Sequence, residues 1–492
     1  MRSSKLVNIL KTFTKEDIKE FEKFVASPYF SRGRNLSPFF NVIKKFYPDF
    51  DSNQYSSEKI FCELFPDKKF NTNSVNIIKT LSHELIKLCE EFIIQSGFRS
   101  DLNSKNYYLL DNLRKRKLFN EFEKKYKEAE INFKNDHDGS IRNFLDQYYL
   151  LDLYNEYCIM TRKYKSSFET TAEMDEISVL VGLIRSYRGF LNKMISVKGY
   201  NLEPVSNFSE NVIRNLDSQK LLAEMKDSGS KYLPFVAVNH MLYMMNEYPE
   251  VTDYYFHLKK LIYDNIKLFG HEPKYILFCS LASYCASMTE VPGNEKFTKE
   301  QFEIYDKILS LGLHKWSDKD DFSIHLFRNI VLSAVSMNKT DWLENFINKF
   351  VKELAPEDRE NMKHYSSAIL NYERKKYESA LNDIMKITFN FVHYKLDIKN
   401  LMFKIYFDMN LYNEALSVLE TLRQYLKEAK ERSVSNKNRN KNFVKFAREL
   451  IKLKTSPDKI HPEYFYNKIL NEDLLFSKSW LLERADSLLK KQ

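Results

Sequence analysis

The stretch RKKYESAL at Arg374–Leu381 returns 35 residues later as MNLYNEAL at Met409–Leu416. Both stretches carry a short polar turn and a tyrosine, followed by an alanine and a leucine at the third and fourth positions after the tyrosine. A small residue lets two packed helices approach closely, so alanine recurs where the helices of a hairpin cross. The pattern predicts a repeated helical hairpin, with the tyrosine opening its second helix.

An earlier part of the chain extends the repeat to a third copy. A shift of 35 residues superposes apolar positions in four sets: Val335 with Leu370 and Ile405, Met337 with Tyr372 and Phe407, Trp342 with Tyr377 and Tyr412, and Phe346 with Leu381 and Leu416. Because such agreement at a constant phase is typical of repeat proteins, we expect three hairpins from about Phe327 to Leu426.

The turn and the opening of the second helix resemble tetratricopeptide (TPR) repeats, whose period is about 34 residues. The small residue expected in the first helix is Ser333 and Ala368 in two copies but Phe403 in the third, so the family's peptide-binding positions do not transfer. The whole chain also resembles an uncharacterised group of bacterial proteins, through its phrases Ser27–Phe30 and Leu64–Pro66. These resemblances imply an N-terminal helical bundle followed by a TPR-like α–α solenoid, and they imply no activity.

The composition independently favours helices. The chain has 10 glycines and 12 prolines in 492 residues, whereas glycine alone usually makes up about 7% of a protein. Few glycines leave few of the positive-φ turns that β-hairpins and phosphate-binding loops need. Since one compact core stops growing near ~250–300 residues, we predict an all-α chain made of several domains or an elongated array.

The first ~100 residues form a helical unit of a different kind. Thr14 and Asp17 fit a capping box, and Ile18, Phe21 and Phe24 follow at helical spacing. We therefore predict an N-terminal cap domain over residues 1–100, irregular helical hairpins over 101–325, and TPR-like repeats with a basic C-terminal segment over 326–492.

The formal charge of +9 is concentrated in one segment. Between Arg423 and Lys459 there are 12 Lys or Arg and 4 Asp or Glu, a local excess of eight positive charges. Lys437, Arg439 and Lys441 alternate with asparagines in Ser433–Asn442, which we expect to be a loop between two helices. The candidate contacts to an anionic partner are Lys437, Arg439, Lys441, Lys445 and Arg448. The alternative is a solvated loop with basic helix ends, which the helix dipole also favours.

No enzyme motif is present in the sequence, which contains no GxGxxG, GKS/T, GxSxG or HExxH pattern. Asp321 and His325 have the i, i+4 spacing of a metal-binding pair on a helix, but no third ligand is in view. The five cysteines form no CxxC pair. We expect no catalytic residue, cofactor or metal.

No apolar segment reaches the ~18 residues that a membrane-spanning helix needs, so we expect no membrane contact and a cytoplasmic location.

A protein–protein interaction scaffold with a protein or peptide partner is the leading hypothesis. The alternative is a nucleic-acid-associated or regulatory protein that uses the basic segment. Tyr55–Phe92 also has the outline of a helix-turn-helix, but its polar face is scarcely basic and we favour a structural cap.

Overall fold

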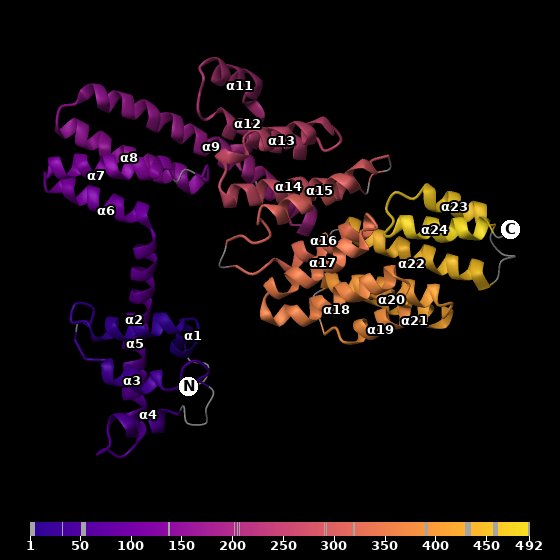
Figure 1. Ribbon diagram of the computed structural model, residues 1–492, viewed down its shortest axis with the longest axis horizontal. Coiled ribbons are helices and arrows are strands. Elements are labelled where there is room, and N and C mark those ends of the chain that lie inside the picture. Colours follow the sequence, from indigo (N-terminus) through magenta and orange to yellow (C-terminus); the bar gives the residue numbers. More distant parts are fainter. Residues whose placement is uncertain are drawn as a thin grey trace. The chain divides into compact units, whose positions relative to one another are not determined.

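The computed structural model describes residues 5–31, 33–50, 56–135, 138–200, 202–203, 205, 207–289, 291, 293–317, 320–388, 392–428, 434–455 and 461–490. These residues form 24 α-helices and two short 3-10 helices, without a strand (Figure 1). The predicted all-α class is confirmed. Within the described part of the chain, no helix combines the length and the apolar character needed to cross a membrane.

The chain divides into two compact units. Unit 1 comprises residues 1–135 and 149–167, and unit 2 comprises residues 136–148 and 168–492. This division rests on spatial contacts, and the domain boundaries drawn at residues 100 and 325 stay predictions. The helices of unit 1 are α1 (Lys5–Lys11), α2 (Lys15–Ala26), α3 (Ser37–Lys44), α4 (Ser57–Leu64), α5 (Thr72–Ser100), α6 (Leu102–Lys115), α7 (Phe119–Asn135), much of α8 (Ile141–Met160) and the start of α9 (Tyr164–Tyr200).

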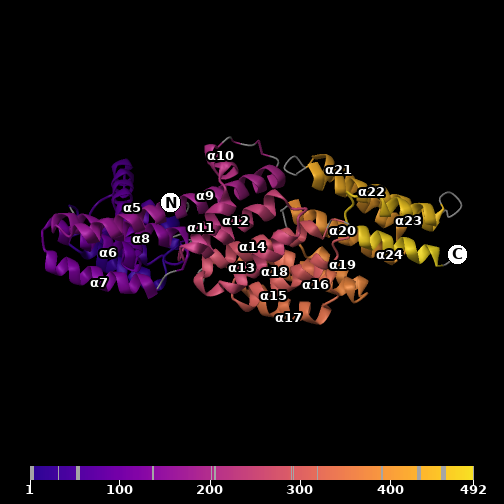
Figure 2. The ribbon, with the colours of Figure 1, turned by 90° about the horizontal axis from the view of Figure 1, so that it is seen from above.

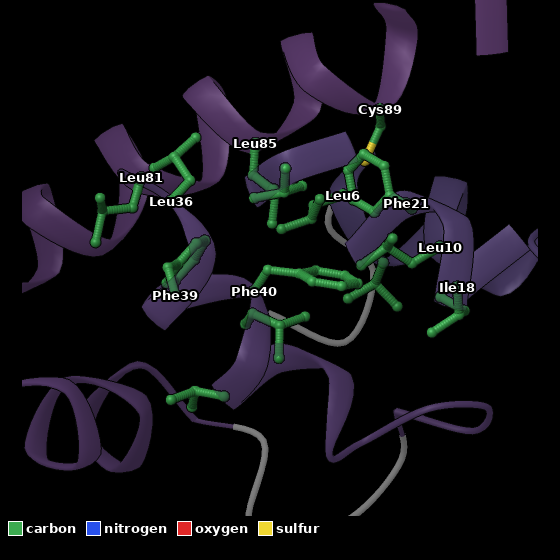
Figure 3. Close-up of a cluster of buried hydrophobic side chains, with 14 of the residues drawn as sticks. Leu6, Leu10, Ile18, Phe21, Leu36, Phe39, Phe40, Leu81, Leu85 and Cys89 are labelled. Carbon is green, nitrogen blue, oxygen red and sulfur yellow. The ribbon is translucent and has the colours of Figure 1, made fainter. Parts of the chain in front are cut away.

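The first five helices share one core, part of which Figure 3 shows. Leu6, Phe21, Phe40 and Leu85 come from four different helices and are essentially inaccessible to solvent. Full burial of one such side chain contributes about 1.5–3 kcal/mol. The capping box of α2 is confirmed, because the hydroxyl of Thr14 accepts from the backbone N–H of Asp17 at 3.0 Å and the Asp17 carboxylate accepts from Thr14 N–H at 2.9 Å.

Unit 2 continues α9 and adds the remaining helices. These are α10 (Phe208–Asn215), α11 (Ser218–Asp227), α12 (Leu233–Glu247), α13 (Asp253–Asp264), η1 (Ile266–Leu268), α14 (His271–Met288), α15 (Lys296–Ser310), α16 (Ile324–Ser336), α17 (Thr340–Phe350), η2 (Val351–Glu353), α18 (Pro356–Glu373), α19 (Tyr377–Met385), α20 (Val392–Asp408), α21 (Tyr412–Glu428), α22 (Val434–Thr455), α23 (Pro462–Leu470) and α24 (Lys478–Leu489). Neighbouring helices pack in pairs, such as α12 with α13, α14 with α15, and α18 with α19 (Figure 2).

Five connections share one turn geometry although none contains glycine. Lys117, Arg162, Asn338, Lys375 and Asn410 each adopt a left-handed conformation with φ between 53° and 60°. In each turn the next residue donates its N–H to a carbonyl five positions earlier, as Lys376 does to Asn371 at 2.8 Å. This is the Schellman closure of a helix, in which glycine is the usual residue. The glycine-poor chain therefore accepts backbone strain at these turns.

The turns also correct the phase of the predicted repeat. The left-handed residues Asn338, Lys375 and Asn410 are 37 and then 35 residues apart. The turns of the second and third hairpins therefore keep the predicted 35-residue spacing, whereas the turn of the first hairpin lies two positions earlier than predicted. Leu343, Ala380 and Ala415 each lie five residues after the left-handed residue of their turn, and all three are buried. The 35-residue shift would have matched the two alanines with Asn345 instead. Leu416, which the 35-residue pattern aligns with Phe346 and Leu381, is 39% exposed.

Candidate functional site

The basic segment lies in helix α22 (Val434–Thr455), so the predicted loop at Ser433–Asn442 is wrong over residues 434–442; Ser433 itself lies outside the described residues. Phe443, Phe446 and Leu450 of the same helix are buried in the C-terminal core. Helices in proteins are stabilised mainly by tertiary packing of an apolar face. Packing of that face extends the helix through the asparagine-rich stretch, whose local propensity alone favours a turn.

Four of the five predicted contact residues share one face of α22. Lys437, Lys441, Lys445 and Arg448 follow one another at spacings of four, four and three residues, and Lys452 continues the row. Residues at these spacings are neighbours on a helix surface. Lys441, Lys445 and Lys452 are exposed, whereas Lys437 and Arg448 are half-buried. We call this row of five residues the basic face of α22.

One end of the basic face is partly neutralised. The Arg448 guanidinium donates a 2.5 Å hydrogen bond to the Glu420 carboxylate of α21, which also accepts from Arg423. Hydrogen bonding from Arg423, together with that from Arg448 and the charges of both, lowers the pKa of Glu420 to about 2. Arg448 is therefore already engaged, and the exposed lysines carry most of the positive charge that this face presents.

The fifth predicted residue, Arg439, lies away from the basic face and lines a cavity of about 490 Å³ within unit 2. The cavity is walled by side chains from five helices and adjacent loops. They are Ala286, Thr289, Thr298, Gln301, Arg328, Asn329, Leu332, Ser333, Ser336, Leu396, Asp397, Asn400, Arg439, Asn440 and Phe476. Amide and hydroxyl groups predominate, which suits a hydrogen-bonding ligand.

A partly buried ion pair forms one wall of this cavity. Arg328 of α16 donates two hydrogen bonds to Asp397 of α20, at 2.5 and 2.9 Å, and the Tyr365 hydroxyl of α18 donates a third at 2.9 Å. Burial lowers the pKa of Arg328, but the charge and hydrogen bonds of Asp397 outweigh it and the pKa is raised overall. Three helices are thereby joined through one carboxylate.

At the cavity wall, Ser333 Oγ and Asn400 Oδ1 have no hydrogen-bond partner among the described residues. Ser333 is 3% exposed and Asn400 is 2% exposed. The Asn400 amide makes one long contact, 3.4 Å, to Asn440 Oδ1. Because a buried polar group without a partner costs about 1–3 kcal/mol, these atoms are sites where a bound group or water would contribute. The sequence offered no signal beyond polar residues that interrupt apolar helix faces.

The remaining sequence candidates do not assemble into a site. Asp321 precedes α16, which begins at Ile324, so it does not share a helix with His325 as we expected. The His325 ring instead stacks on Tyr394, with a centroid separation of 6.4 Å. Over the described part of the chain, no three His, Cys, Asp or Glu side chains gather as a metal site would require.

In the N-terminal region, Ile60, Phe61, Leu81 and Leu85 of α4 and α5 are buried in the core of unit 1. This burial agrees with a structural role for Tyr55–Phe92, of which Tyr55 lies outside the described residues.

Comparisons of the chain with protein-family models, with curated proteins and with solved structures find no match.

Proposed function

We propose that this protein is a non-enzymatic scaffold, built as a TPR-like α–α solenoid, which docks an acidic segment of a partner protein on the basic face of α22. The observation that carries the proposal is the row of cations on that face. Lysines four residues apart lie about 6 Å apart along the helix axis. This spacing matches carboxylates at i and i+4 on a facing acidic helix, so charge complementarity can fix its register.

The binding free energy of these ion pairs alone is too small to hold a partner firmly, so a second contact is needed. An exposed pair contributes about 0.2–1 kcal/mol. Three such pairs, one for each exposed lysine, therefore give at most about 3 kcal/mol, which corresponds to a dissociation constant above about 1 mM. We propose that the cavity beside Arg439 supplies the second contact, since Ser333 and Asn400 present unpartnered polar atoms there. A polar side chain or backbone segment of the partner would satisfy them.

The experiment is a titration of the full chain with a fluorescein-labelled peptide in which glutamate recurs every four residues. Binding should be weak and should fall as salt rises, because exposed charges are screened beyond about 10 Å at 0.1 M salt. The variant Lys441→Glu, Lys445→Glu, Lys452→Glu should abolish it. The matched control reverses three exposed lysines of α18, the α18–α19 turn and the end of α19: Lys363→Glu, Lys376→Glu, Lys386→Glu. Equal binding by both variants would contradict the proposal.

Nucleic-acid association through the same face is the second candidate, since lysines and arginines in a row can also contact phosphates. Glu420, paired with Arg448, and Glu449, which binds Lys468 at 2.7 Å, reduce the positive charge near this face, and we rank nucleic acid second because its dense row of phosphates needs a larger basic surface. A duplex or single-stranded oligonucleotide that displaces the acidic peptide and binds more tightly would reverse this order.

We propose a reducing cytoplasm as the location. All five cysteines are free thiols, and three of them are buried. Disulfides are rare in cytosolic proteins, so an unpaired set fits that compartment.

A further inference from the structure

Helix α11 (Ser218–Asp227) contributes no side chain to the protein core. It contains Leu221, Leu222 and Met225, yet none of its residues is buried. Every other described α-helix of eight to fifteen residues contributes at least one buried side chain to the fold. The apolar side of α11 is thus only partly covered in the isolated chain.

The uncovered side of α11 faces a groove. The groove has a volume of about 510 Å³ and lies within unit 2, between α9, α11 and the start of α12. Its apolar surface is formed by Val179, Leu180, Leu183, Leu221, Met225, Tyr232 and Val236. Val179, in the middle of α9, is 60% exposed. Covering such side chains is favourable by about 25 cal/mol per Å² of apolar surface.

The rim of the same groove is acidic. Asp175 and Glu176 of α9 and Glu224 of α11 line it, and no lysine or arginine is among the lining residues. Of the lysines that flank the groove in sequence, Lys231 binds Glu173 at 2.6 Å and Lys220 lies 4.0 Å from Glu224, while Lys226 is exposed and is not among the lining residues. An apolar floor between carboxylates therefore selects an occupant with both apolar and basic side chains.

We infer that the α9–α11 groove docks a basic amphipathic helix of a partner protein. Its apolar side chains, at i, i+3 and i+4, would pack against Val179, Leu221 and Met225, as a helix does in a hydrophobic groove. Its lysines or arginines would flank that row and meet Asp175, Glu176 and Glu224. The basic face of α22 in a second copy does not fit, because its row of lysines and arginines presents no apolar side chain to the floor.

This site has the opposite charge to the basic face of α22 and does not depend on it. The two surfaces therefore select different partners, and each can be tested with the other disabled. In the variant Lys441→Glu, Lys445→Glu, Lys452→Glu, binding to the α9–α11 groove should be unchanged.

The test uses the full-length protein and a labelled helical peptide of about 16 residues, with leucines at i, i+3, i+4 and i+7 and lysines beside them. A second peptide replaces every lysine with glutamate. Fluorescence anisotropy should show saturable binding of the lysine peptide and at least tenfold weaker binding of the glutamate peptide. Leu221→Asp with Met225→Asp should weaken the lysine peptide at least tenfold, and Glu176→Lys with Glu224→Lys should favour the glutamate peptide.

The matched control is Val212→Asp on α10, a position that is 52% exposed and lies outside the groove. It should leave the affinity unchanged. Circular dichroism checks that each variant is folded. No saturable binding up to about 1 mM peptide would overturn the inference, as would equal affinity for both peptides. A dimer in sedimentation that Leu221→Asp dissociates would also overturn it, in favour of a second copy as the occupant.

Discussion

The indole N–H of Trp480, in α24, donates a 2.7 Å hydrogen bond to the hydroxyl oxygen of Tyr372, in α18, although the two residues are 108 positions apart. Both side chains are buried, each with 8% exposure. The Tyr372 hydroxyl in turn donates to Asp408 of α20 at 2.8 Å, and Arg484 of α24 donates two hydrogen bonds to the same carboxylate. This network ties the C-terminal helix to two earlier helices.

Removal of the indole donor should therefore destabilise unit 2. We expect Trp480→Phe to lower the free energy of unfolding by about 1–2 kcal/mol, because it deletes one buried hydrogen bond and keeps most of the ring packing. Thermal denaturation followed by circular dichroism measures the change. Trp316→Phe is the control, since Trp316 is 47% exposed, and its effect should stay within about 0.5 kcal/mol. Equal shifts for the two variants would show that the hydrogen bond is not stabilising.

Replacement of Lys375 by glycine would measure the backbone strain at the turns that lack glycine. Its φ of 58° is left-handed, a conformation in which a side chain costs about 1–2 kcal/mol and glycine costs little. We expect Lys375→Gly to raise the free energy of unfolding by about 0.5–1 kcal/mol after the greater entropy of unfolded glycine is subtracted. Lys376→Gly is the matched control, because Lys376 has an ordinary φ of −89°. It should destabilise, and a loss of stability in both variants would contradict the assignment of strain.

Lys404 of α20 should destabilise the fold at neutral pH. Burial lowers its pKa to about 8, against the opposing charge of Glu373, and its ammonium lies 5.7 Å from the Trp480 ring. The native pKa is below the unfolded value of about 10.4. The charged Lys404 side chain therefore destabilises the fold fully below about pH 8, and this destabilisation disappears as the pH rises from about 8 to about 10.4. We expect Lys404→Met to raise the free energy of unfolding by about 1 kcal/mol at pH 7.

The gain from Lys404→Met should shrink between pH 8 and pH 10, which chemical denaturation at several pH values would measure. Lys363→Met is the control, because Lys363 lies exposed on α18. A gain that is the same at pH 7 and pH 10 would mean that added apolar packing, and not removal of a buried charge, stabilises the variant.

Glu420 should limit the charge that the basic face of α22 offers. Because Arg423 and Arg448 hold the pKa of this carboxyl at about 2, mild acidification does not release Arg448, whereas Glu420→Gln does. We expect Glu420→Gln to tighten binding of the glutamate-rich peptide by about two- to fivefold, in line with the strength of one exposed ion pair. Anisotropy titration at low salt measures this. Glu449→Gln, which would release Lys468, is the comparison, and an equal gain would show that only net charge matters.

Ser333 and Ser366 form a matched pair of buried serines. Ser366 Oγ donates to the Met362 carbonyl at 2.6 Å, whereas Ser333 Oγ has no partner in the described structure. Replacing an unpartnered buried hydroxyl by a methyl group is neutral or stabilising, and replacing a bonded one costs about 0.5–1.5 kcal/mol. We expect Ser333→Ala to be at least as stable as the parent and Ser366→Ala to be less stable. A loss in Ser333→Ala would indicate a bound water or ligand at the cavity wall.

Local patterns in the sequence determined the helices and several of their details. The capping box at Thr14, the burial of Phe21 and Phe24, and the matching hairpins opened by Tyr377 and Tyr412 were all predictable. Each of these features depends on residues within one or two helical turns of one another, and a period of about 3.6 residues is visible in the sequence itself.

The tertiary structure decided which residues meet and where. It made residues 434–442 helical, because burial of Phe443 and Phe446 outweighs the weak propensity of the asparagines. It turned Arg439 away from the basic row and into a cavity, and it brought Arg328 to Asp397 across 69 positions. Such meetings depend on how helices far apart in the sequence pack against one another. Local periodicity therefore predicts the helices, while the surfaces proposed for binding follow only from their packing.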